Sequence, residues 1–79
     1  MEDAKIRFTI PSDGIVKVDL FTPNGTPVKN LLWAQQYEGT NEVTWNGTNT
    51  VGAVVANGVY LYRILYEDQV ITGRLIFHR

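Results

Sequence analysis

The sequence predicts an all-β sandwich, and three observations predict it. Apolar and polar residues alternate in several short stretches, which is the pattern of half-buried strands. Turn-forming residues recur about every eight to twelve residues, as they do in sandwiches. No amphipathic helical pattern separates the alternating stretches, so a parallel α/β sheet is disfavoured. We therefore expect about seven strands in two packed sheets.

The length of the chain limits it to one domain. The chain has 79 residues, of which 44% are hydrophobic and 11% aromatic. A domain of this size has little stability to spare, so its apolar residues must form one continuous core. We expect a single domain over residues 1–79. Its start, Met1-Glu2-Asp3, is typical of a domain excised from a longer protein or forming the C-terminal part of one.

The first two expected strands alternate clearly. Residues 4–10 place Ile6, Phe8 and Ile10 on one face, and residues 15–21 repeat the pattern. The stretch between them, residues 11–14, contains proline and glycine and predicts a turn. We therefore expect these two strands to form a hairpin.

The next stretch, residues 28–37, is less regular. Leu31, Leu32 and Trp33 are consecutive apolar residues, which interrupts the alternation. A strand with a bulge, or one that switches between sheets, accounts for this. A one-turn helix is the competing interpretation. Residues 42–45 then predict a short strand with Val43 and Trp45 pointing inward.

The rest of the chain is organised around a loop that follows Trp45. Asn46-Gly47 and Asn57-Gly58 tolerate positive φ, so the backbone can turn at both ends of this loop. Residues 59–66 predict an apolar and aromatic strand beside or facing that of Trp45. Such a strand is central and buried on both faces, or carries stacked tyrosines on one face. Residues 70–78 predict the last strand.

Composition excludes several classes of function. The net charge is −1 and the isoelectric point is near 5.6, and the cationic residues are scattered, so neither nucleic acid nor an anionic membrane surface is an expected partner. No apolar run is long enough for a membrane-spanning helix. The chain has no cysteine, which excludes disulfides and thiolate metal sites. No cofactor is expected.

Several segments together resemble a known family. They are Gly14 to Phe21, Asn24-Gly25 with Val28 and Leu31-Leu32, Gly39, Val43-Thr-Trp-Asn-Gly47, Gly52, Val55 to Arg63 and Gly73 to Ile76. From about Lys5 to His78 the chain resembles the immunoglobulin-like domain of the flagellar hook-capping protein and its relatives. Similar domains include the type IX secretion sorting domains at the C-termini of secreted bacterial proteins. The resemblance implies an immunoglobulin-like β-sandwich, found outside the cell or on its surface.

Two groups of candidate residues follow. Trp45, Asn46, Gly47, Gly58, Tyr60 and Tyr62 are expected to build the core and its turns. Trp33, Tyr37 and Tyr66 are candidates for an exposed aromatic surface that binds protein or glycan. Packing in the core or between the sheets is the competing interpretation of that second group.

Catalysis and metal binding have little support in the sequence. Ser12 lies in a turn and His78 lies at the chain end, so a Ser-His-Asp arrangement would join two poorly anchored residues. Glu67 and Asp68 are adjacent at a hairpin tip and do not face each other across a cleft. The long loop offers mainly amide and hydroxyl oxygens, whereas calcium sites usually include carboxylates. We expect neither an enzyme nor a metal site.

The main functional hypothesis is a non-catalytic accessory domain of a secreted or cell-surface bacterial protein. It would serve structural support, sorting, anchoring or protein interaction, with the parent chain or the secretion and surface machinery as partner. The alternatives are a scaffold fragment of the flagellar hook cap and a carbohydrate-binding module. Free edges on the first and last strands are compatible with a monomer or with weak self-association.

Overall fold

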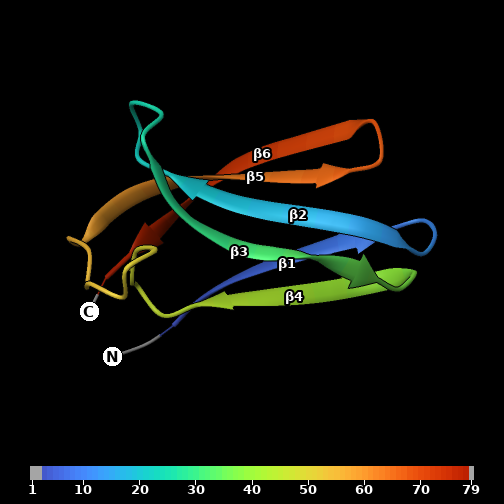
Figure 1. Ribbon diagram of the computed structural model, residues 1–79, viewed down its shortest axis with the longest axis horizontal. Coiled ribbons are helices and arrows are strands. Elements are labelled where there is room, and N and C mark those ends of the chain that lie inside the picture. Colours follow the sequence, from blue (N-terminus) through green and yellow to red (C-terminus); the bar gives the residue numbers. More distant parts are fainter. Residues whose placement is uncertain (1–2, 79) are drawn as a thin grey trace.

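The structure, a computed structural model, describes residues 3–78 and contains six strands in that range. The strand number is close to the seven expected. Figure 1 shows them packed in two layers, with the two chain ends on the same side of the molecule. The strands are β1 (Ala4–Ile10), β2 (Gly14–Phe21), β3 (Pro27–Gln36), β4 (Gly39–Trp45), β5 (Gly58–Tyr66) and β6 (Gln69–Phe77). Within the described residues, no helix could span a membrane.

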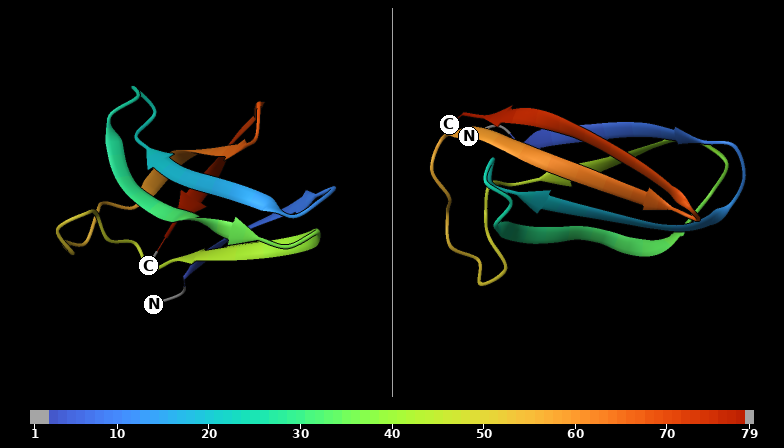
Figure 2. Two further views of the ribbon diagram at one scale, coloured as in Figure 1. Left: turned by 45° about the vertical axis from the view of Figure 1, so that its right-hand side comes forward. Right: turned by 90° about the horizontal axis from the view of Figure 1, so that it is seen from above.

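The strands form two antiparallel sheets, so the predicted all-β sandwich is confirmed. One sheet contains β1 and β4, and the other has the order β3-β2-β5-β6. The two sheets lie face to face in the views of Figure 2. The core fills the space between them. Its members are Ile6, Phe8, Ile10, Val16, Val18, Leu20, Val28, Val43, Trp45, Tyr60, Ile64, Tyr66 and Phe77.

The expected hairpin between the first two strands is wrong. β1 pairs with β4, from Ala4 opposite Trp45 to Ile10 opposite Gly39, whereas β2 pairs with β3 and β5. The turn after Ile10 therefore carries the chain from one sheet to the other. Alternation reports only that one face of a strand is buried, and that face is buried equally by pairing within a sheet or by packing across the core.

The irregular stretch is a strand and not a helix. β3 pairs with β2 along its whole length, and the register shifts between Val18 and Asp19. This irregularity explains why consecutive apolar residues occur there, because a bulge changes which side chains face the core. Leu31 and Leu32 are half-buried against the core, and Trp33 is exposed.

Trp45 anchors the contact between the sheets. It ends β4 and is 1% exposed. Its ring lies 5.1 Å from that of Tyr60 in an edge-on arrangement and 5.0 Å from that of Phe77. Its Nε1 donates a hydrogen bond of 2.8 Å to the Thr48 carbonyl, which satisfies the indole N–H inside the core. Trp45 and β5 therefore face each other across the core.

Two glycines let aromatic rings approach the backbone. Gly47 follows Trp45 with a φ of +80°, and a Cβ there would lie 2.1 Å from the Phe77 ring. Gly73 of β6 lies beneath Tyr62, where a Cβ would come within 2.4 Å of the ring. Asn46 precedes Gly47, is exposed, and accepts a hydrogen bond from the Thr48 hydroxyl.

β5 is the central aromatic strand. It lies between β2 and β6. Tyr60, Tyr62, Ile64 and Tyr66 alternate along its inner face, and all except the half-buried Tyr62 belong to the core. The tyrosines therefore line one face of β5, and the opposite face is only partly covered.

Candidate interaction surface

The three aromatic residues proposed for binding occupy different environments. Trp33 is 68% exposed and Tyr37 is 69% exposed. Tyr66 is only 4% exposed, so its assignment to an exposed surface is wrong. The Tyr66 hydroxyl donates a hydrogen bond of 2.8 Å to the Ser12 carbonyl, and this bond lets the phenol end lie within the core layer.

Trp33 and Tyr37 have different surroundings. Tyr37 lies in the connection between β3 and β4, where its carbonyl accepts a hydrogen bond from Asn41. Trp33 lies on β3, and the Lys17 ammonium lies 4.4 Å from its ring centroid. One face of the indole is therefore occupied by a cation and is not open for stacking on a sugar.

Trp33 belongs to a larger surface, the outer face of the four-stranded sheet. This face points away from β1 and β4, and alternation along each strand assigns its members. It is unusual because antiparallel sheets commonly place polar residues on their outer side. Its residues are Ile15, Lys17, Asp19, Phe21, Asn30, Trp33, Val59, Leu61, Arg63, Leu65, Val70, Thr72, Arg74 and Ile76.

A polar row crosses the middle of this outer face. It consists of Asn30, Asp19, Arg63 and Thr72, which are successive partners across the four strands. The Asn30 amide donates a hydrogen bond of 2.9 Å to Asp19 Oδ1. The other oxygen, Oδ2, lies 3.5 Å from Arg63 Nη2 and 3.9 Å from Lys17 Nζ. The nearly buried Asp19 carboxylate thus lies near two cations, Lys17 and Arg63, whose side chains are partly exposed to solvent.

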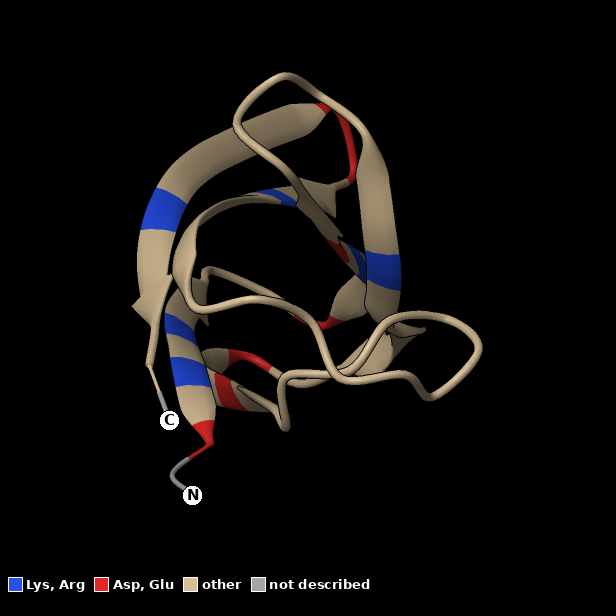
Figure 3. Ribbon diagram, turned by 90° about the vertical axis from the view of Figure 1, so that its left-hand side faces the viewer, with Lys and Arg blue, Asp and Glu red and all other residues tan. Residues whose placement is uncertain are grey.

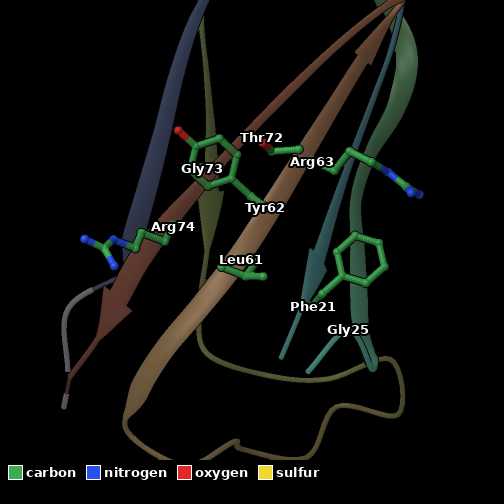
Figure 4. A pocket seen from close by; sticks show the side chains of 8 residues that line it. All are labelled: Phe21, Gly25, Leu61, Tyr62, Arg63, Thr72, Gly73 and Arg74. Atoms are coloured by element: carbon green, nitrogen blue, oxygen red, sulfur yellow. The ribbon is translucent and has the colours of Figure 1, made fainter. Parts of the chain in front are cut away.

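Two shallow depressions lie on either side of the polar row. The first has a volume of about 500 Å³ and is lined by Phe21, Leu61, Arg63 and Arg74 among others. Figure 4 shows the Phe21 ring beside Arg63, with Leu61 between them and Arg74. Here the Arg63 guanidinium carbon lies 4.9 Å from the centroid of the Phe21 ring.

The second depression lies at the other end of the same strands. It has a volume of about 590 Å³ and is lined by Ile15, Lys17, Trp33, Leu65 and Glu67. Apolar side chains that are at least partly exposed therefore flank the polar row on both sides. Large exposed apolar surfaces of this kind mark sites where another molecule binds.

The sequence did not reveal this surface. Asp19 and Lys17 read as ordinary outward residues of an alternating strand, and Leu61 and Leu65 read as part of a fully apolar strand. A usable signal was present, because a central strand with apolar residues on both faces needs a cover on its second face. The identity of the polar row depends on pairing between distant strands.

The structure does not bring the candidate catalytic residues together. The Ser12 hydroxyl lies 2.7 Å from that of Tyr66, at the end of β5. His78 follows Phe77, which pairs with Gly58 at the start of β5. A strand of this length separates its two ends by about 26 Å, which prevents a Ser-His contact. Among residues 3–78, no three His, Asp or Glu side chains gather as a metal site.

Comparison with known proteins identifies the family. The family model described as the FlgD Ig-like domain matches residues 2–69, which is most of the chain. This protein belongs to the FlgD Ig-like domain family. No curated protein matches the chain. The family model supports the flagellar part of the resemblance, and it gives no support to the type IX sorting domains.

A solved structure of a FlgD protein has the same fold. The crystal structure of FlgD from P. aeruginosa aligns with a TM-score of 0.78 and 22% identity. The alignment covers 95% of this chain and 58% of the FlgD chain. Our chain thus spans somewhat more than half the length of that FlgD chain, and its Ig-like fold is shown. In this chain the Lys, Arg, Asp and Glu residues are distributed over both sheets (Figure 3).

Proposed function

We propose that this FlgD-like domain is a non-catalytic scaffold module of a flagellar hook cap. The observation that carries the proposal is the match of residues 2–69 to the FlgD Ig-like domain. A scaffold needs a stable fold and a surface for protein partners, and it needs no reactive cleft. The outer face of the four-stranded sheet offers such a surface, because it combines exposed apolar side chains with cations.

Deleting the domain in the organism that carries it tests this function. We expect cells whose parent protein lacks residues 3–78 to have few or no complete hooks by electron microscopy. Hooks should return when the intact parent protein is supplied from a plasmid. Hooks of normal number and length, with the shortened protein present at its usual level, would contradict the hook-cap role.

A second candidate is an accessory domain of a secreted or cell-surface protein. In FlgD of P. aeruginosa the region aligned with this domain is likewise only part of the chain, 58% of it. A domain of this kind would use the same outer face to contact its parent chain or surface machinery. Protease treatment of intact cells tests the location: digestion of the domain in unbroken cells supports exposure, and digestion only after lysis contradicts it.

A further inference from the structure

We propose that the outer face of the four-stranded sheet binds an extended protein segment with the pattern apolar-x-carboxylate-x-apolar. The carboxylate would pair with Arg63 and Lys17, and the two apolar side chains would fill the two depressions. The inference rests on the proposed protein-binding role, and it holds for a flagellar or a non-flagellar partner. It specifies that the partner segment carries a carboxylate between two apolar side chains.

The register of the strands sets the spacing of this pattern. Phe21 pairs with Leu61 in the first depression, and Lys17 pairs with Leu65 in the second. These two pairs are four residues apart along β2, which corresponds to about 13 Å. In an extended segment, residues i and i+4 are separated by the same distance and point to the same side. Residue i+2 then lies opposite the Asp19 and Arg63 pair, midway between the depressions.

The charge on this face selects an acidic partner. The face carries the cations Lys17, Arg63 and Arg74, against the carboxylates of Asp19 in its polar row and Glu67 beside the second depression. The Asp19 side chain is only 12% exposed, whereas those of Lys17 and Arg63 beside it are 31% and 41% exposed. An approaching molecule therefore meets positive charge, although the chain as a whole has a net charge of −1.

The centre of the polar row also lacks full hydrogen bonding. Arg63 Nε and Asp19 Oδ2 are buried and have no hydrogen-bond partner among residues 3–78. The guanidinium can turn toward an incoming carboxylate without breaking a close hydrogen bond to Asp19. A bidentate pair with a carboxylate would satisfy donors that the free domain leaves unused.

Charge complementarity disfavours a second copy of this chain as the occupant. A two-fold symmetric dimer through the outer face would bring together two copies of a face that carries three cations, Lys17, Arg63 and Arg74. Such like-charge contacts reduce affinity, and they select against wrong partners. A segment that carries a carboxylate at its centre removes this repulsion.

Selection from two displayed peptide libraries tests the proposal. Both libraries have five-residue cores with apolar residues at the first and last positions, and the central residue is Asp or Glu in one and Lys or Arg in the other. We expect enrichment on the immobilised 79-residue chain from the acidic library alone. For the best peptide, Arg63→Gln in the domain should reduce affinity about tenfold or more, whereas Arg63→Lys should lose less.

Controls keep the outcome clear if Arg63→Gln disturbs the fold. Arg7→Gln removes a cation paired with Glu42 on the other sheet, and binding should not change. Replacing the acid of the peptide by its amide leaves the domain intact and should cause a similar tenfold loss. Equal enrichment from both libraries, no enrichment from either, or an amide peptide that binds as well as the acid would overturn the proposal. Concentration-dependent dimerisation blocked by Arg63→Gln would also overturn it, in favour of a second copy.

This test is separate from that of the hook-cap role. It uses only the purified domain and peptides, whereas the hook assay uses cells. Binding of the acidic peptide together with normal hooks in the deletion strain would contradict the hook-cap role and leave the binding surface. Loss of hooks in the deletion strain without peptide binding would support the hook-cap role and overturn the proposed binding surface.

Discussion

The two faces of the four-stranded sheet are built from the same strands and have different roles. On the inner face, Val16, Val18, Leu20 and Ile64 are almost completely buried against β1 and β4. On the outer face, apolar residues of the same strands remain in solvent, and Ile76 of β6 is 74% exposed. Both faces are apolar, and only one is covered within this domain.

The difference shows that hydrophobicity in a strand does not always stabilise its own domain. Burial of apolar surface stabilises the fold, so the inner face supplies the stability. The outer apolar residues gain nothing comparable from folding, because they remain in contact with water. Burial of these outer residues against a partner would therefore contribute to binding free energy. Variants of the two faces should differ in stability, and the following predictions test this contrast.

The largest effect is expected at Gly47, on the inner side. Gly47→Val adds a side chain whose Cβ would lie 2.1 Å from the Phe77 ring. The φ of +80° at this position also disfavours β-branched residues. We expect a loss of more than about 3 kcal/mol in the free energy of unfolding, measured by urea denaturation. A soluble, fully folded Gly47→Val domain of unchanged stability would contradict the close contact.

Gly58→Val is the matched control for Gly47. Gly58 also has a positive φ, +150°, but no atom lies within 4 Å of the position of its Cβ. Only the backbone term remains, and we expect a loss of more than about 1 kcal/mol, well below that at Gly47. An unchanged melting temperature would contradict the turn assigned to Asn57-Gly58.

The next effect compares two isoleucines directly. Ile64 on the inner face is 2% exposed, and Ile76 on the outer face is 74% exposed. We expect Ile64→Ala to lower the free energy of unfolding by about 2–4 kcal/mol. Ile76→Ala should change it by less than about 0.5 kcal/mol. Equal losses in chemical denaturation would show that the outer face is covered in the free domain.

A smaller effect is expected in the polar row of the outer face. Asp19→Asn removes the charge that faces Arg63 and Lys17, and both of these side chains are partly solvated. Solvent screening keeps such pairs weak, so we expect a loss of about 1 kcal/mol, most of it from the hydrogen-bonded charge. Glu42→Gln is the control, because it breaks the exposed pair with Arg7 and should cost less. A larger loss for Glu42→Gln than for Asp19→Asn would reverse this order.

Much of the fold could be predicted because local patterns determine it. The alternation in residues 4–10 and 15–21 gives strands, and the Asn-Gly pairs give turns at Gly47 and Gly58 with positive φ. Pairing could not be predicted in the same way. A turn such as residues 11–14 reverses the chain in a hairpin and in a connection between sheets alike, and the choice depends on distant β4.

The candidate site was less predictable for a related reason. Exposure of Trp33 follows from its place in an irregular strand. Tyr66 looked similar in sequence, but its hydroxyl finds the Ser12 carbonyl from a distant turn. The polar row likewise joins residues that only the registers of four strands bring together. Local sequence reports the face of a residue, and tertiary pairing decides its neighbours.

The smallest predicted effect concerns the turn between β5 and β6, which sets the register in which these two strands pair. Glu67 lies in the two-residue connection between β5 and β6 with a φ of +54°, a left-handed conformation that costs glutamate energy. We expect Glu67→Asn to raise the free energy of unfolding by about 0.5–1 kcal/mol, because asparagine tolerates this conformation. Thermal denaturation measures the gain, with Gln69→Asn as the control outside the turn. A one-residue slip here would exchange the inner and outer residues of β6, so a stabilised turn should leave the contrast between Ile64 and Ile76 unchanged. A loss of stability in Glu67→Asn would show that the glutamate side chain contributes more through its contacts than its backbone costs.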